Sequence, residues 1–385
     1  MNAKKWVLTF LLLALVLVLG LAAFNYVTDP FAAFGDKFLN WFSYDETNNP
    51  RVAKISYLEQ HHDEYDSYIL GCSSTSSLQV SDFNKLYDAN FYNLIMYGAD
   101  MRDCEKIADY LIEHYEVKHL VLNVYLDNGF TYDDETDRLT RNLHYLTDPD
   151  TSALSFYTRY LFCDPRYGFA KLKNLRNEVT GEYDKRVRDV EPIGSMDTYL
   201  EAYPVFADYP KTGDFVLGQT ENCMKSVAAI KERCEAAGVE LVVVAAPVYI
   251  DYFQNFQAED VANFYASLAK VTDFWDFSCS SVSCEPRYFY DATHFRNAVG
   301  SMIAARIAGD DSVYIPDDFG TYVTADTPSS YFSEVLQATA LPDETVSRDV
   351  PVLMWHNLAE ESSGDMTISV DTFRAQIEAL AAELC

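Results

Sequence analysis

The sequence predicts an α/β protein in which a mostly parallel, five-stranded sheet lies between two layers of helices. Five short runs are almost continuously apolar, which is typical of strands covered on both faces rather than on one. Amphipathic stretches separate the runs, as expected for the β-α-β-α order of a three-layer α/β/α fold. The predicted strands are Tyr65–Gly71, Phe91–Met96, Lys118–Tyr125, Val239–Pro247 and Asp273–Phe277.

Two helices between these strands are well marked. Residues 101–115 place Ile107, Leu111 and Tyr115 on one stripe, which would pack on the sheet. Residues 221–237 end at Gly238, a residue type favoured just after the last turn of a helix. We expect helices on both faces of the sheet.

The N-terminal segment predicts a membrane anchor. Lys4 and Lys5 precede Trp6–Phe24, a segment of apolar or small residues. A helix of about 20 such residues crosses the hydrocarbon core of a bilayer. Lysines before the span favour a cytoplasmic N-terminus, with the rest of the chain outside the cell membrane. The alternative is a cleaved signal peptide, but this apolar segment is longer than usual for one and no small-residue cleavage site follows.

The chain divides into four predicted segments. Residues 1–28 form the basic start and the anchor, and residues 29–315 form the α/β domain. Within that domain, residues 126–212 are rich in Tyr, Arg, Asp and Asn, and we interpret them as an insertion over the carboxyl edge of the sheet. Residues 316–348 have the composition of a linker with one short helix, and residues 349–385 begin a further domain that is too short to close its own core.

The charge of the chain excludes one class of partner. Asp and Glu outnumber Lys and Arg by 59 to 29, so the net charge is −30. Nucleic acid would require clustered basic side chains to contact its phosphates. We therefore expect no nucleic-acid partner.

A candidate nucleophile follows the first predicted strand, in Gly71-Cys72-Ser73-Ser74-Thr75. Glycine allows a sharp turn at the end of the strand, so that Ser73 would lie at the carboxyl edge of the sheet. There a histidine could activate its hydroxyl, and its amide could face an oxyanion. The alternative is that these hydroxyl residues only cap a helix.

A candidate base lies near the end of the same domain, in Asp291-Ala292-Thr293-His294. Asp291 and His294 are three positions apart, so the carboxylate can orient the imidazole while the ring reaches a serine on another strand end. The alternative is a capping residue followed by a surface histidine.

These residues resemble the SGNH hydrolases, and within them the membrane-anchored acyl-transfer branch that includes the D-alanine transfer protein of teichoic-acid modification. The matching blocks are Gly71-Cys72-Ser73, Asn93–Gly98 and Asp291–His294, and the resemblance covers roughly residues 30–310. It implies an SGNH or flavodoxin-like sheet and a Ser73–His294–Asp291 triad. It also implies an oxyanion hole made by the amides of Ser73 and Gly98.

The sequence departs from the family pattern in two places. Cys72 stands where the hydrolase branch commonly has aspartate, and the Gly-x-Asn-Asp block has no clear counterpart. Asn123, in VLNVYLDN, is the nearest candidate for the third donor of the hole. The resemblance implies no cofactor and no metal for this domain.

A second resemblance covers the C-terminal residues. Val350–Asn357, Thr367-Ile368-Ser369 and Phe373–Ile377 are similar to the opening of a polysaccharide deacetylase of the chitooligosaccharide-deacetylase homology class. Such enzymes hold a divalent metal through motifs further along the chain. We therefore expect a fragment that binds no metal by itself, with His356 as a structural residue.

Together these features predict an extracytoplasmic, membrane-anchored esterase or O-acyltransferase that acts on cell-envelope polysaccharide and is fused to a polysaccharide deacetylase. The alternative is a non-catalytic carbohydrate-binding or anchoring module that positions the deacetylase at the cell wall. The distance between His294 and Ser73 discriminates between them, because only catalysis requires the two side chains to meet.

Overall fold

The computed structural model describes residues 3–39, 48–130, 138–173, 195–337, 357–360 and 367–384. The chain separates into two compact units, residues 1–343 and residues 344–385. The first unit contains the N-terminal helix and the α/β domain, and the second contains a short strand pair and a helix.

A mixed sheet of six strands forms the centre of the first unit, in the order β2-β1-β3-β4-β5-β8. The first five strands run parallel to their neighbours, and only β8 is antiparallel. Tyr68, Ile69 and Leu70 of β1 are fully buried, as the continuous apolar run predicts. The strands are β1 (Ser67–Gly71), β2 (Phe91–Ile95), β3 (His119–Asn123), β4 (Glu240–Ala245), β5 (Phe274–Asp276) and β8 (Thr321–Val323).

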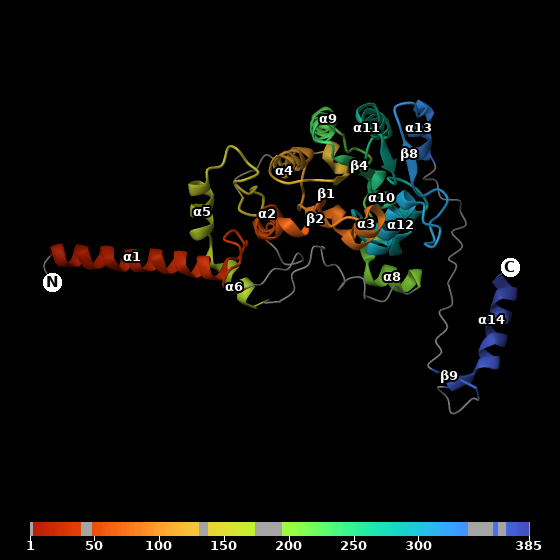
Figure 1. The fold of residues 1–385 in the computed structure, drawn as a ribbon, viewed down its shortest axis with the longest axis horizontal. Helices are drawn as coiled ribbons and strands as arrows, with labels where there is room; N and C mark the ends of the chain where they lie inside the picture. Colours follow the sequence, from red (N-terminus) through yellow and green to blue (C-terminus); the bar gives the residue numbers. More distant parts are fainter. Residues whose placement is uncertain are drawn as a thin grey trace. The chain divides into compact units, whose positions relative to one another are not determined.

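Helices cover both faces of this sheet, so the predicted α/β class and the mostly parallel sheet are confirmed (Figure 1). On one face lie α4 (Met101–His114), α9 (Thr220–Ala237) and α11 (Ala258–Val271). On the other lie α2 (Pro50–His61), α3 (Val80–Tyr87) and α12 (Asn297–Ala308). The two well-marked helices are found within a residue of their expected starts. Gly238 ends α9 at φ 72°, the left-handed conformation that glycine adopts without strain.

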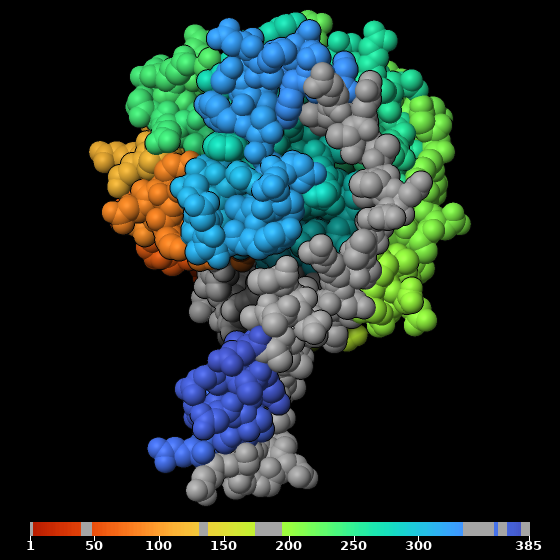
Figure 2. Space-filling view, turned by 90° about the vertical axis from the view of Figure 1, so that its right-hand side faces the viewer, coloured from red at the N-terminus to blue at the C-terminus, as the bar shows by residue number. Residues whose placement is uncertain are grey.

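The prediction of five strands is wrong by one, because β8 lies in the segment expected to be a linker. Its three residues pair antiparallel with β5, and only Val323 is buried. A strand of this length has no recognisable apolar run, so its composition resembles that of a linker. The next helix, α13 (Ser329–Gln337), contacts α11. The segment between α12 and Gln337 lies at the surface, in the lighter blue of Figure 2.

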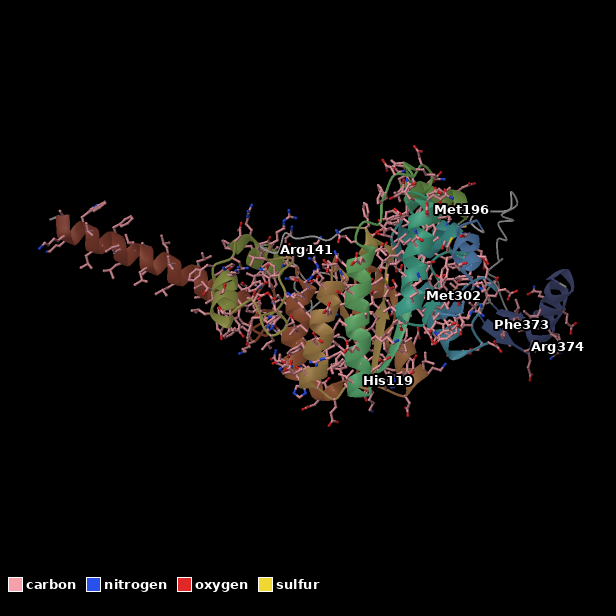
Figure 3. All side chains as sticks on the ribbon, turned by 90° about the horizontal axis from the view of Figure 1, so that it is seen from above. His119, Arg141, Met196, Met302, Phe373 and Arg374 are labelled. Carbon is pink, nitrogen blue, oxygen red and sulfur yellow. The ribbon has the colours of Figure 1, made fainter. Side chains whose placement is uncertain are left out.

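The insertion contributes to the carboxyl edge of the sheet. In Figure 3, Arg141 and Met196 lie at one edge, and His119, the first residue of β3, lies at the other. Because the strands are parallel, Arg141 and Met196 therefore mark the carboxyl edge. The described helices of the insertion are α5 (Ala153–Leu161), α6 (Pro165–Lys173) and α8 (Met196–Ala202).

The N-terminal helix α1 (Ala3–Thr28) is long and apolar enough to span a membrane. Its C-terminal end contacts α5 and α6 (Figure 1). The α1 side chain of Asn25 is fully buried and donates hydrogen bonds to the carbonyls of Leu161 and Cys163, at 3.0 and 2.8 Å. The helix is thus joined to the insertion by specific polar contacts.

The second unit contains β9 (Asn357–Ala359), β10 (Thr367–Ser369) and α14 (Val370–Leu384), with the two strands parallel. Residues 350–356 of the deacetylase-like segment, including His356, lie outside the described residues.

Candidate active site

The loop after β1 depends on Gly71. A Cβ atom at this position would lie 2.1 Å from Thr75 Oγ1 and 3.1 Å from the Asn123 side chain. The missing side chain therefore lets the chain fold back at once into a short 3-10 helix, η2 (Ser73–Ser77). The strand ends and Ser73 begins η2 only two residues later.

The hydroxyl residues of η2 have separate roles. Ser74 Oγ and Thr75 Oγ1 both accept hydrogen bonds from the Asn123 amide at 3.1 Å, which ties η2 to β3. Ser77 Oγ donates to the Phe295 carbonyl at 2.6 Å. These contacts fix η2 from two sides, so most of its hydroxyls hold the loop in place.

Ser73 is different, because its hydroxyl meets a histidine. The distance between Ser73 Oγ and His294 Nε2 is 2.8 Å, a normal hydrogen-bond length. The two residues are far apart in sequence but come together at the carboxyl edge of the sheet. With the ring proton on Nδ1, the serine hydroxyl donates to Nε2, the arrangement required for a general base acting on a nucleophile.

Asp291 holds the other side of the imidazole. His294 Nδ1 lies 2.8 and 2.9 Å from the two carboxylate oxygens of Asp291. The pair sits in a tight hairpin of β6 (Phe289–Asp291) and β7 (His294–Phe295). Asp291 Oδ1 also accepts from the amides of Thr293 and His294, at 2.9 and 3.0 Å. The carboxylate thus orients both the turn and the ring.

The Asp291 carboxyl is kept ionised. Burial by itself would raise its pKa, but the hydrogen bonds and the charge of His294, together with the Thr293 contacts, lower the pKa well below its usual value. At neutral pH the carboxylate can therefore stabilise a protonated imidazole, which is the role of the acid in a catalytic triad.

The insertion buttresses this hairpin through α8. Tyr199 donates a hydrogen bond to the Phe289 carbonyl and accepts one from the buried Arg296 guanidinium at 2.9 Å. Arg296 also lies over the Tyr290 ring, 4.5 Å from its centre. Residues on both sides of the Asp291–His294 pair are therefore anchored in buried contacts.

Cys72, next to Ser73, carries a thiol that is not ionised near neutral pH. Its thiol is buried, and burial raises its pKa to about 11, which keeps it protonated near neutral pH. Its Sγ lies 3.1 Å from Ser74 Oγ. In the SGNH hydrolases that the sequence resembles, this position is commonly an aspartate. Here it holds the buried, neutral side chain of Cys72.

A cavity of about 390 Å³ opens over Ser73 and His294. Gly98, which follows β2, lines the same cavity. Gly98 has φ 55°, and a Cβ there would lie 2.5 Å from the Arg141 guanidinium, so a side chain would be strained and would displace Arg141. Two of the three residues expected in the oxyanion hole, Ser73 and Gly98, therefore face one cavity.

Asn123, the third residue expected there, is directed elsewhere. It is fully buried, and both N–H groups of its amide donate into η2, to Ser74 and Thr75. Its oxygen accepts from the Ala246 amide at 3.3 Å. In this structure Asn123 therefore holds η2 against β3, and Ser73 and Gly98 are the two expected hole residues that face the cavity, while the role of Asn123 in an oxyanion hole stays a prediction.

Asp127 lines the cavity instead and was not expected from the sequence. It belongs to a short 3-10 helix after β3, η3 (Leu126–Gly129), and accepts a hydrogen bond from Tyr252 at 2.5 Å. Burial raises its pKa to about 6, although Tyr252 and the charge of His294 act in the opposite direction. The only sequence signal for it is the position of LDNG directly after a strand end.

A second cavity, of about 380 Å³, adjoins the first at Gly98, Asp100 and Arg141, which line both. Arg141 donates to the Gly98 carbonyl at 2.7 Å, so its guanidinium is held at the boundary. The second cavity is rich in charge, including the ion pair of Arg51 with Asp103. A ligand longer than a single ester group could extend into it from Ser73.

Metal ligands do not gather in the described part of the chain: there, no three His, Cys, Asp or Glu side chains come together as a group that could hold an ion. His61 and His62, adjacent in the sequence, pair with Glu64 and Asp63 at 2.8 and 3.0 Å.

The chain was also compared with known proteins. No family model matches it, and no curated protein matches it. The geometry of the Ser73–His294–Asp291 site, together with the resemblance of its three sequence blocks, therefore supplies the basis for a functional assignment.

Proposed function

We propose that this protein is a membrane-anchored serine esterase or O-acyltransferase that acts on cell-envelope polysaccharide. The observation that carries the proposal is the continuous hydrogen-bonded chain from Ser73 Oγ through both nitrogens of His294 to Asp291. Side chains from the two ends of the domain meet there in the order that acyl transfer requires. The resemblance to the acyl-transfer branch of the SGNH hydrolases points to the same chemistry.

In the proposed reaction, Ser73 Oγ attacks the carbonyl carbon of an ester while His294 Nε2 takes the hydroxyl proton. The resulting oxyanion lies near the amides of Ser73 and Gly98. The tetrahedral species collapses, the bond to the alcohol oxygen breaks, and the imidazolium returns its proton to the departing alkoxide. The acyl group remains on Ser73 as an ester.

In the second half, an acceptor hydroxyl attacks the acyl-serine, His294 takes its proton, and Ser73 is released with that proton. Water as the acceptor gives hydrolysis, and a sugar hydroxyl gives acyl transfer. Asp127 carries a carboxylate in the same cavity, so its charge favours the imidazolium in both halves.

The proposed oxyanion hole has two amide donors, from Ser73 and Gly98, and lacks the third donor of the family that the sequence resembles. One such donor contributes about 10²-fold or more in rate.

The substrate class and the location rest on the resemblance and on α1. A polymer at the cell envelope suits an enzyme whose helix can be anchored in the cell membrane, and Lys4 and Lys5 favour a cytoplasmic N-terminus. The adjoining charged cavity offers room for a sugar next to the ester group. We further propose that residues 349–385 begin a polysaccharide deacetylase domain, which would need a divalent metal when complete.

A non-catalytic carbohydrate-binding or anchoring module is the competing proposal. It makes no demand on the distance between His294 and Ser73. The 2.8 Å separation therefore favours catalysis over simple binding.

The proposal is tested by substituting Ser73→Ala in the full chain. We expect turnover of an acetyl-ester substrate such as p-nitrophenyl acetate to fall by about 10³-fold or more, because the acyl-serine can no longer form. The Ser74→Ala variant is the matched comparison and should lose much less activity, because Ser74 holds the loop and does not face His294. Equal activity of the Ser73→Ala variant and the parent protein would contradict the mechanism.

A further inference from the structure

The α5–α6 segment, residues 153–173, presents large apolar side chains to solvent beside the end of α1. Leu154 is 80% exposed, Phe169 61% and Phe162 46%. On the opposite side of α5, Phe156 and Tyr160 are buried against Phe31. The helix pair is thus packed on one side and apolar on the other. We define the collar as the exposed large apolar side chains of this segment together with Phe38, which packs on Tyr26 of α1: Phe38, Leu154, Phe162, Phe169 and Leu172.

Specific contacts hold the collar at the last apolar turn of α1. The Phe169 ring lies against the Phe24 ring, with centroids 4.7 Å apart. Gly168 permits this approach, because a Cβ there would lie 2.6 Å from the Phe24 ring and 2.7 Å from Thr28 Oγ1. Asn25 is hydrogen-bonded to the turn between α5 and α6. In Figure 1 both helices lie beside this end of α1.

The length of α1 sets the depth of these contacts. At 1.5 Å per residue, the apolar stretch from Trp6 to Phe24 spans about 27 Å, close to the ~30 Å thickness of a hydrocarbon core. If α1 crosses the bilayer, Phe24 lies at the boundary between hydrocarbon and headgroups. Phe169, packed on Phe24, must then lie at the same level.

The charge of the segment matches an anionic surface. Residues 153–173 contain four basic residues against the single acid Asp164, in a chain whose net charge is −30. Arg159, Arg166 and Lys173 are exposed, whereas Lys171 is buried and paired with Asp36, and Arg166 pairs with Asp164. Basic side chains next to exposed aromatic and leucine side chains are typical of helices that lie in the interface of a membrane with acidic lipids.

We propose that the collar inserts into the outer boundary of the bilayer and binds acidic lipid headgroups, so that the α/β domain is held against the membrane beside α1. The continuous apolar surface from α1 to Phe169 and the local excess of positive charge support a lipid surface as the occupant. This inference rests on α1 crossing the bilayer and does not depend on the proposed esterase activity.

The test measures the depth of the collar in the full chain, reconstituted in nanodiscs of phosphatidylcholine and phosphatidylglycerol with brominated acyl chains. Phe169→Trp and Leu154→Trp add a fluorophore to the collar, and Tyr314→Trp adds one to a site 79% exposed and far from α1 in sequence. The difference in emission between each variant and the parent isolates the added tryptophan. The chain has four tryptophans of its own, so the difference between the parent and Trp6→Phe isolates Trp6 of α1, which serves as the reference for insertion.

We expect bromolipid to quench the added emission of both collar variants to a degree comparable with Trp6, and to leave that of the Tyr314→Trp variant unchanged. Charge reversal by Arg166→Glu and Lys173→Glu should weaken quenching of the Phe169→Trp variant, most strongly in discs rich in phosphatidylglycerol. Collar variants as insensitive as the Tyr314→Trp variant would overturn the proposal. Absence of quenching at Trp6 would also overturn it, because α1 would then not cross the bilayer.

Discussion

At the scale of single residues, the hydroxyl side chains of η2 divide into one that meets a histidine and others that hold the loop. Ser73 faces His294, whereas Ser74 and Thr75 accept from Asn123 and Ser77 donates to the Phe295 carbonyl. The hydroxyl-rich sequence is therefore explained by the need to fix a short loop from both sides. The proposed chemistry belongs to Ser73, whose hydroxyl meets His294.

Asp291 offers a prediction about orientation. In Asp291→Asn, an amide replaces the carboxylate that holds His294 Nδ1, so the ring loses both its fixed tautomer and the charge that stabilises its protonated form. We expect kcat for an acetyl ester to fall by about 10²-fold or more, with a smaller change in KM. The matched control is Asp326→Asn, at an exposed position outside the site, which should leave both constants unchanged. A loss confined to KM would contradict an orienting role.

Asp127 offers a prediction about stability. The folded protein holds the Asp127 proton up to about pH 6, whereas the unfolded chain releases it near pH 3.8. Between these values the folded state binds more protons, so stability contributed by this group falls as pH rises. In Asp127→Asn this contribution disappears, and we expect the variant to gain about 2 kcal/mol relative to the parent on going from pH 4 to pH 7.

The measurement for Asp127 is thermal unfolding of both proteins in the same detergent across that pH range. The apparent Tm of the variant should rise relative to the parent as pH increases. Parallel curves for the two proteins would contradict a raised pKa at this position.

At the scale of elements, the position of Ser73 depends on how α12 packs against η2. At Gly300 of α12, an added Cβ would lie 1.7 Å from the Ser77 carbonyl oxygen, so the helix contacts the loop backbone directly. Because both partners are backbone, no side chain can move aside to relieve the contact. The helix that follows His294 therefore also sets the position of η2, and with it that of Ser73.

This packing predicts that Gly300→Ala displaces η2. We expect a loss of about 1–3 kcal/mol in stability from overpacking, together with a fall in kcat even though every triad residue is present. Gly218→Ala is the matched control, because nothing lies within 4 Å of the added Cβ there. If the Gly300→Ala variant folds and retains the kcat of the Gly218→Ala variant, α12 does not position the loop.

The elements also explain which parts of the fold could be predicted from sequence. Parallel strands such as β1 are buried on both faces, and their apolar runs are visible without any knowledge of their neighbours. The edge strand β8 buries only Val323 and exists because β5 offers it a partner, so its own three residues carry no such signal.

The same distinction applies to the site. Ser73 could be proposed because it follows the end of a predicted strand. Asp291 and His294 could be proposed because they are closely spaced and histidine is rare in this chain. Asn123 is the last residue of β3 and Asp127 follows it four residues later, and only the path of η3 decides that Asp127 faces the cavity. That path depends on tertiary contacts such as the Tyr252 hydrogen bond to Asp127.

At the scale of the whole molecule, the order of the sheet accounts for the location of the site. The first five strands have the order β2-β1-β3-β4-β5. The chain therefore places β2 on one side of β1 and then adds β3, β4 and β5 in turn on the other side. Loops leaving β1 and β3 separate at this change of side and leave a crevice at the carboxyl edge. Ser73 follows β1 and Asp127 follows β3, so both line the cavity that this topology creates.

The central claim is that Ser73 is a nucleophile activated by His294. The most direct measurement is reaction of the full chain with a fluorophosphonate, followed by mass spectrometry of its peptides. We predict a phosphonyl adduct on Ser73 that is absent from Ser73→Ala and forms far more slowly in His294→Ala. A protein that remains folded but carries no adduct on Ser73, or a His294→Ala variant that reacts as fast as the parent, would contradict the claim.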